Sequence, residues 1–523
     1  MSYRVEQKIK GRIYVYEVEC YWDKEKKQPR QKRKYLGPKE KIYNQPKISK
    51  KEKYRSSNFI SKSYGDIFLI QYLQDELGIS ALLKKVFQED YQTMLALSSF
   101  MLQENSPSYL FPYWHDEHYL LKIDRLNSQQ LSSLYEKLGR CERECWTFLK
   151  YWGKHLSPTD GIYYDITSIS SYSDQIDWVE WGYNRDKEIL PQINIGLTHC
   201  LKTSLPLSYH VHPGSIVDVS TLKNTIKRFE LFELSNMFYI LDRGFCSITN
   251  LLAMHQSKMR FIQPLSFRLK KAKALALSHK KTICSAENAM KYQEEILYYA
   301  KDKIIFEEIT FNAHLFYNEK LSIDYKHHLY KAILELEEMI KDLDSEQARD
   351  KFFSDSIPNR YRRYFRQDKK GLILRDQIAI DEDIFFSGVM IFVVDNMKDI
   401  QSHAIIEYYR NRDRIEKEIN TLKNYIDGKR IRAHHQDTAN GRLFIKFLAL
   451  IIYTKIVNVI KKDSKLKHYS INEIIAELRK LKVNIFSKEQ HFLTELSKKQ
   501  KMIFKAFGVN LENIDQYLTS QSA

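Results

Sequence analysis

Apolar and polar positions alternate in different ways along the chain, and the changes mark its segments. Residues 1–50 alternate at every second position, as in RIYVYEVECYW, which predicts a small β-hairpin with a strongly basic turn. Residues 59–156 carry apolar positions at helical spacing, which predicts an all-helical domain. From residue 160 onwards, short runs rich in β-branched and aromatic residues predict strands. The chain is therefore expected to pass from a hairpin through helices into a mixed α/β part.

The runs after residue 160 predict strands in a particular order. GIYYDITSIS, QINIGLTHC and LPLSYHVH predict three antiparallel strands, VSTLKNTIKRF predicts a helix, and MFYILD predicts a fourth strand. Three antiparallel strands, a helix and a further strand are the opening order of an RNase H-like α/β fold. RFIQPL and GVMIFVVDN predict two more strands, and the apolar run LFIKFLALIIYTKIVNVI predicts a helix packed beneath a helix predicted over residues 409–423.

Residues 265–383 interrupt this α/β pattern. They combine β-type runs (IIFEEITF, AHLFYN), a long helical run and the basic tract NRYRRYFRQDKK. We therefore expect an RNase H-like core formed by residues 160–264 and 384–460, with a β-rich and helical insertion between its two parts. Residues 461–523 carry many lysines at helical spacing, which predicts a basic helical C-terminal region.

The run EYYRNRDRIEKEINTLKN places four polar residues on one face of a predicted helix. At about 100° per residue the four fall on a stripe roughly 60° wide: Tyr409, Arg412, Glu416 and Lys423. An apolar stripe, which would be buried, adjoins it. A carboxylate flanked by two cations and a phenol suits a site that holds a metal ion and a phosphate. Charged residues at this spacing more often form a solvated face with i,i+4 pairs, so the helix alone does not decide between the two interpretations.

Two aspartates belong to predicted apolar strands: Asp165 ends the first strand or lies within it, and Asp242 ends the fourth. Asp165 lies in YYDITS and Asp242 lies in ILDRGF, so each carboxylate would emerge at the edge of a buried sheet. A single aspartate there is ordinarily a cap or turn residue. Together with Glu416 on the later helix, however, they form a set of three hard oxygen ligands for two Mg²⁺ ions. Two such ions about 4 Å apart stabilise the attacking and the departing oxygen of an in-line displacement at phosphorus.

The composition indicates which class of molecule the protein binds. Lys and Arg total 83 against 66 Asp and Glu in 523 residues, and the net charge of +17 favours nucleic acid through counterion release. No run of eighteen apolar residues occurs, and no apolar segment follows the basic N-terminus, so neither a membrane span nor a secretory signal is expected. The six cysteines form no CxxC pair, which is typical of a reducing cytoplasm and of core packing.

Several of these segments together resemble the DDE transposases of the insertion sequence 4 superfamily, in the branch with a β-hairpin N-terminus. The matching segments are YYDITS, GYNRDKEILPQINIGLTH, LPLSYHVHPGSIVDVSTL, ILDRGF and the Y-R-E-K spacing in the helix described above. They are spread over residues 160–265 and 384–460, and the first 150 residues resemble the superfamily more loosely. Several independent motifs in the same order make the resemblance specific, whereas each motif alone would be weak.

The resemblance implies a role for each matching residue. Asp165, Asp242 and Glu416 would be the catalytic acids that bind two Mg²⁺ or Mn²⁺ ions. DNA would be contacted by the neighbouring cations and the phenol: Tyr409, Arg412, Lys423 and Arg243, with Arg185 either touching DNA or bracing the site. The implied activity is cleavage at transposon terminal inverted repeats and joining of 3′-OH ends to target DNA. The resemblance also implies a homodimer that assembles on DNA and does not associate with a membrane. Its implied location is the cytoplasm of a prokaryote, at the nucleoid. Recognition of the transposon ends is expected in residues 1–156 and in the basic tail.

One feature departs from the superfamily. Members that form a DNA hairpin are thought to trap a flipped base against a tryptophan of the insertion, but the last tryptophan here is Trp181. A tyrosine or phenylalanine such as Phe316 or Tyr317 would have to replace it. Two alternative functions remain open from the residues. One is a catalytically inactive or repurposed sequence-specific DNA-binding protein, and the other is an RNase H-like nuclease that acts on RNA or Holliday junctions.

Overall fold

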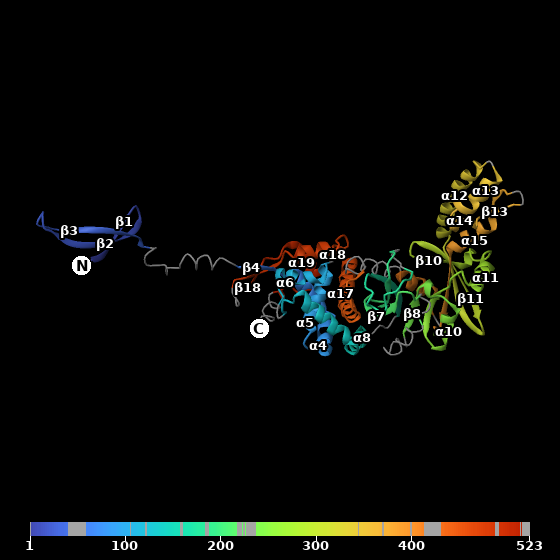
Figure 1. Cartoon of the computed structure of the whole chain (residues 1–523), viewed down its shortest axis with the longest axis horizontal. Helices are drawn as coiled ribbons and strands as arrows, with labels where there is room; N and C mark the ends of the chain where they lie inside the picture. The colour runs from blue at the N-terminus through green and yellow to red at the C-terminus, as the bar shows by residue number, and fades with distance from the viewer. Residues whose placement is uncertain are drawn as a thin grey trace.

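The computed structural model shows a long molecule built around one large mixed sheet (Figure 1). The residues that it describes are 2–39, 59–104, 106–120, 123–156, 161–183, 188–216, 222, 225, 237–343, 345–368, 371–397, 400–412, 430–486, 491–512 and 514.

The N-terminal region is a three-stranded antiparallel sheet rather than the predicted hairpin. Its strands are β1 (Ser2–Ile9), β2 (Arg12–Asp23) and β3 (Gln28–Pro38). The prediction missed β1, although its alternation continues that of β2. Most of the basic residues assigned to the turn lie instead on β3: Arg30, Lys32, Arg33 and Lys34.

The helical domain predicted over residues 59–156 is confirmed as helical. Its helices are α3 (Gly65–Glu76), α4 (Ile79–Phe87), α5 (Tyr91–Gln103), α6 (Phe111–Glu117), α7 (Ser128–Arg140) and α8 (Glu142–Leu156). A short strand, β4 (Ile60–Ser63), precedes them and pairs with the C-terminal region. Asn127 begins α7 with a reciprocal cap, because its side chain accepts from the N–H of Gln130 while the Gln130 side chain accepts from the N–H of Asn127.

The C-terminal region is less helical than predicted. Helices α18 (Ile471–Leu478) and α19 (Lys498–Ala506) are present, but two strands lie between them, β17 (Lys482–Ile485) and β18 (His491–Leu493). Strand β17 pairs antiparallel with both β18 and β4. The helical prediction failed there because β17 is only four residues long and exists through pairing with a strand about 420 residues away.

The strands predicted after residue 160 are confirmed. They are β5 (Ile162–Ser171), β6 (Gln192–Cys200), β7 (Pro206–Pro213), β8 (Phe238–Leu241), β9 (Arg260–Pro264) and β15 (Val389–Asp395). Helix α10 (Ile248–Gln256) connects β8 to β9. The sheet runs β10-β11-β12-β15-β9-β8-β5-β6-β7, with β8 parallel to both β5 and β9. The helix predicted over VSTLKNTIKRF lies outside the described residues apart from Leu222 and Thr225.

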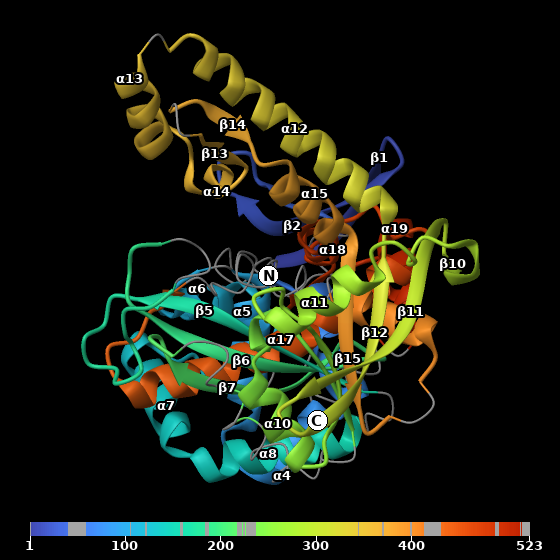
Figure 2. The same ribbon diagram turned by 90° about the vertical axis from the view of Figure 1, so that its right-hand side faces the viewer.

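The residues predicted to form an insertion contribute strands to this same sheet. Strands β10 (Ala289–Tyr292), β11 (Glu295–Phe306) and β12 (Ile309–Tyr317) extend it beyond β15, next to α11 (Lys270–His279). The helical part forms a small core of its own: α12 (Glu319–Lys341), α13 (Glu346–Lys351), α14 (Asn359–Arg362), β13 (Phe365–Gln367), β14 (Ile373–Arg375) and α15 (Gln377–Gly388). Figure 2 shows this part projecting from the β10 end of the sheet. The predicted domain boundaries stay a prediction.

The predicted apolar helix is confirmed as α17 (Gln436–Lys462), which packs against α3, α5, α7 and β7. It is long and apolar enough to span a membrane by length and composition, but 78% of its most apolar window is buried inside the protein. It therefore has the burial of a core helix, and it holds the helical domain against the sheet (Figure 1).

Candidate active site

The register of two parallel strands brings Asp165 and Asp242 together. Strand β5 pairs with β8 so that Tyr163 lies beside Ile240 and Tyr164 beside Leu241. Asp165 and Asp242 take the next position, and strands in a sheet lie about 4.8 Å apart. Every residue of β8 is buried, so the chain leaves the sheet at Asp242 with the carboxylate at its edge. Asp242 follows the last residue of β8, as predicted, whereas Asp165 is the fourth residue of β5 and lies within a strand that continues to Ser171.

Local hydrogen bonds orient both aspartates. Asp242 begins the short helix η2 (Arg243–Phe245), and its Oδ1 accepts from the N–H of Arg243 at 2.5 Å. The Oδ1 of Asp165 accepts from the N–H of Ile166 at 2.8 Å. The backbone oxygen of Asp242 accepts from Nε2 of Gln263 at 2.8 Å. Gln263 is fully buried, so β9 fixes the point at which the chain turns after Asp242.

A helix over residues 402–412 covers this part of the sheet. Side chains of Tyr163 and Asp165 point to the same face of β5, because successive residues of a strand alternate. The hydroxyl of Tyr163 donates to the backbone oxygen of Tyr408 at 2.5 Å, and the ring of Tyr408 lies 5.1 Å from that of Phe238. The helix therefore lies over the face to which Asp165 points.

The same helix places the side chain of Arg412 beside Asp242. The guanidinium Nη1 of Arg412 donates to Oδ1 of Asp242 in an ion pair, and Arg412 is only 7% exposed. Its guanidinium carbon lies 4.9 Å from the ring centroid of Tyr409, and that ring packs edge-on against Phe392 of β15 at 4.8 Å. Burial between an aromatic ring and a carboxylate holds the guanidinium in one plane.

The neighbouring Arg410 anchors the helix on its other side. Its Nη2 donates to Glu295 of β11 at 2.9 Å, and its guanidinium lies 4.7 Å from the ring centroid of Tyr292. Strands from the predicted insertion thus help to position the helix that reaches Asp242.

The predicted site residues fall into two groups. The structure brings together Asp165, Asp242, Arg412 and, through Arg412, Tyr409. Arg243 follows Asp242 with an exposed side chain. Glu416, Lys423 and Arg185 lie outside the described residues, so their predicted places are untested. Among the described residues, no group of three or more His, Cys, Asp or Glu side chains could hold a metal ion, and the two aspartates are the part of the predicted set that can be seen.

Sequence reasoning did not identify Gln263 or Tyr163 as supports of the site. Gln263 carried a signal, because it is the one polar residue inside the apolar run FIQPL. The two aromatic residues proposed as stacking partners for a flipped base are not available in this structure, because Phe316 is fully buried and Tyr317 is 8% exposed in β12. That suggestion is therefore not supported.

Comparison with known proteins gives one match that covers most of the α/β part. The family described as "Transposase DDE domain" matches residues 156–452. No curated protein matches the chain. Among solved structures, the chain is similar to the piggyBac transposase in its synaptic complex with hairpin DNA. The TM-score is 0.35 and the identity is 11%, over 74% of this chain and 69% of that chain. A similarity this low carries no inference about function.

Proposed function

Because this chain belongs to the family of transposases with a DDE domain, we propose that it cuts DNA at transposon terminal inverted repeats and joins the freed 3′-OH ends to target DNA. The observation that supports this most strongly is the register of β5 and β8, in which Asp165 and Asp242 occupy neighbouring positions. The ion pair between Arg412 and Asp242 is a second support, because it holds the helix that carries Tyr409 and Arg412 next to Asp242.

The proposal includes an RNase H-like core. Its support is the strand order β7-β6-β5-β8-β9, in which three antiparallel strands are followed by two parallel ones. In such a sheet Asp165 of β5 lies beside the point where β8 ends at Asp242, and a phosphodiester would approach the two carboxylates there.

Asp165 and Asp242, with Glu416, would hold two Mg²⁺ or Mn²⁺ ions. The donor set fits, because carboxylate oxygens are the ligands that these hard cations prefer and two carboxylates at strand spacing repel each other without a cation. Glu416 follows Arg412 by four residues, which is one turn of a helix. Bound ions would supply charge stabilisation for both oxygens of an in-line displacement. The assignment of Glu416 rests on its position in the sequence.

The cations of the chain would hold the DNA. Arg412 is held in place by Tyr409 and by Asp242, so it would contact a phosphate without first losing side-chain entropy. Lys423 would hold a second phosphate, Tyr409 would lie against the backbone at the cleavage site, and the exposed Arg243 would contact the strand that leaves the site. Two copies of the chain would bridge two transposon ends.

The test is Mg²⁺-dependent nicking of a duplex that carries the inverted repeats flanking the gene. We expect Asp242→Asn and Asp165→Asn each to reduce nicking at least a hundredfold while DNA binding is retained, because each removes one negative ligand. Asp395→Asn is the matched control. Asp395 also ends a strand of this sheet, but its register with Phe261 places it at the opposite edge, where it pairs with His255.

Equal nicking by Asp242→Asn and Asp395→Asn would remove Asp242 from the chemistry. If the wild-type protein and all three variants bind the duplex equally and none nicks it, the protein is a DNA-binding protein without cleavage activity. A second measurement is the thermal shift on adding Mn²⁺, which we expect for the wild type and for Asp395→Asn but not for the Asp165→Asn, Asp242→Asn double variant.

A further inference from the structure

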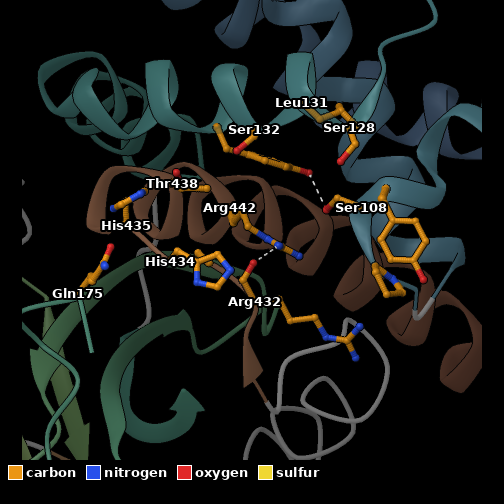
Figure 3. A pocket seen from close by; sticks show the side chains of 14 residues that line it. Ser108, Ser128, Leu131, Ser132, Gln175, Arg432, His434, His435, Thr438 and Arg442 are labelled. Carbon is orange, nitrogen blue, oxygen red and sulfur yellow. Dashed lines mark hydrogen bonds between the residues drawn. The ribbon is translucent and has the colours of Figure 1, made fainter. Parts of the chain in front are cut away.

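A cavity of about 840 Å³ opens between α7 and the first turn of α17, away from the aspartates (Figure 3). Its walls come from the helical domain and from the segment after the short strand β16 (Arg430–Ile431). The lining combines hydroxyl groups with basic groups, among them Ser108, Ser132, Thr438, Arg432, His434 and Arg442. No Asp or Glu is among the described residues that line it. The cavity therefore combines apolar groups with hydroxyl groups and positive charge.

One of its arginines is built into the protein. Arg442 rises from α17 and is only 9% exposed. Its Nη1 donates to the backbone oxygen of Arg432, as the dashed line in Figure 3 shows, and its guanidinium lies 5.6 Å from the ring centroid of Tyr135. Tyr135 in turn lies 3.3 Å from Ser108 through the two hydroxyl oxygens. A buried guanidinium held against a ring is a fixed positive charge in the wall of the cavity.

The remaining groups at the cavity suit a phosphate. Arg432 and His434 have exposed side chains, as does Ser132 on the opposite wall. Arginine, hydroxyl groups and the N–H groups at a helix start are the donors that usually contact phosphate oxygens of nucleic acids. The 27-residue helix α17 starts at this cavity and has no side-chain cap there. The dipole of a helix favours an anion at its N-terminus. Tyr109, 58% exposed at the rim, offers a ring to a sugar or a base.

The segment that lines the cavity follows β16, which pairs with the far end of the strand that carries Asp165. Strand β16 runs parallel to β5 and pairs with Ser170 and Ser171, whereas β8 pairs with β5 only as far as Tyr164. Asp165 and Ser170 are five residues apart on one strand, a separation of about 17 Å at roughly 3.3 Å per residue. That corresponds to about five nucleotides of duplex at about 3.4 Å each. One DNA molecule can therefore reach both places.

We propose that this cavity binds a backbone phosphate of the same DNA that is held at the aspartates, about five nucleotides from the bond that is cut. The proposal rests on the proposed function for the position of the cut, but binding of DNA by the cavity can be tested without cleavage. Its occupant would fix the angle at which DNA crosses between the helical domain and the sheet.

The test measures affinity for a 40-base-pair duplex of arbitrary sequence as a function of salt. A matched pair of variants is Ser132→Glu and Ser133→Glu. Both residues are exposed neighbours on α7, but only Ser132 lines the cavity. We expect Ser132→Glu to weaken binding about two- to tenfold, since it places a carboxylate beside the phosphate, and Ser133→Glu to have little effect.

A second pair removes positive charge. Arg432→Gln should lower the slope of log affinity against log salt by about 0.9, the value for one lost phosphate contact. Arg140→Gln removes the same charge from α7, where Arg140 pairs with Glu136 and Asp437 and does not line the cavity, and should leave the slope unchanged. Equal effects within either pair would overturn the proposal.

Two further outcomes separate the possible results. Inorganic phosphate that raises the melting temperature of the wild type but not of Arg432→Gln, with DNA slopes unchanged, would identify a small-anion site and overturn binding of DNA there. If wild type nicks inverted repeats and Arg432→Gln binds DNA as the wild type does, only this proposal fails. If the predicted slope change is found and no duplex is nicked, binding of a DNA phosphate in the cavity is supported and the cleavage proposal fails.

Discussion

Arg412 shows how much one side chain depends on its surroundings. Its helix position could be predicted, but its burial, its ring partner and its pairing with Asp242 come from the packing of a helix across β5, β8 and β15. An arginine in this place has two functions, because it neutralises a carboxylate and keeps N–H groups directed toward the site.

Replacing Arg412 with lysine should separate charge from geometry. Lysine keeps the positive charge but loses the planar group that stacks on Tyr409 and donates from several nitrogens. We expect Arg412→Lys to reduce nicking roughly ten- to a hundredfold, the effect of losing about 1.5–3 kcal/mol in charge-assisted hydrogen bonds. Arg410→Lys, on the same helix but paired with Glu295, is the control, and a similar loss in both variants would argue against a special place for Arg412.

His314 gives a prediction for stability. It lies in β12 with Nδ1 2.9 Å from the Tyr299 hydroxyl, and burial, with a smaller contribution from Lys301, lowers the pKa of its imidazole from 6.5 to about 4. The folded protein therefore favours the neutral ring. The contribution of this group to the free energy of unfolding is fully present above pH 6.5 and is lost as the pH falls from 6.5 through about 4, by roughly 3 kcal/mol in total.

Urea denaturation at pH 7 and pH 4.5 measures this loss. His314→Gln should lose less stability than the wild type between the two values, because it has no proton to take up. The control is His403→Gln, an exposed histidine on the helix over residues 402–412. Equal pH dependence of the wild type and His314→Gln would contradict the prediction.

Among the helices, the pair α7 and α17 is held by close backbone approach. A Cβ at Gly441 would lie 2.0 Å from the backbone oxygen of Tyr135, and one at Gly139 would lie 1.8 Å from that of Asp437. Only glycine leaves room for the two helices at this distance. The same approach places Tyr135 against Arg442 and so shapes the cavity between the helices.

Gly441→Ala should therefore destabilise the protein by about 1–3 kcal/mol, because overpacking forces the helices apart. Gly153→Ala in α8 is the matched control, since a Cβ there meets nothing within 4 Å and alanine is the better helix residue by up to about 1 kcal/mol. We expect the two melting temperatures to move in opposite directions. A decrease of the same size in both would show that backbone approach is not the cause.

Across the whole molecule, the helical domain and the C-terminal region meet in a buried polar network. Asp66 of α3 is 1% exposed and accepts from Nε of Arg479 at 3.1 Å, and it also lies 3.2 Å from Nε2 of His118. Arg479 donates as well to Glu104 at 2.9 Å. The pairing of β4 with β17 joins the same regions, so the helical domain requires residues that are about 400 positions later in the sequence.

Asp66→Ala should cost about 3–5 kcal/mol, because it leaves the partly buried Arg479 and the buried His118 without their shared carboxylate. The control is Asp116→Ala, which breaks an exposed pair with Arg125 and should cost about 1 kcal/mol or less. Denaturant midpoints of the two variants measure the difference. Similar midpoints would mean that the network contributes no more than a surface pair.

The sequence by itself determined the strands of the α/β part, the apolar helix α17, and the placement of Asp165 within a strand and of Asp242 at a strand end, because period-two and helical patterns are local properties that burial imposes on neighbouring residues. It did not reveal the third N-terminal strand, the β4–β17 pairing or the extension of the sheet by β10–β12. Tertiary structure alone decided these, together with the contact of Arg412 with Asp242 and the cavity between α7 and α17. Each depends on which distant segments pack together, and that choice is made by the free energy of the whole fold rather than by any local pattern.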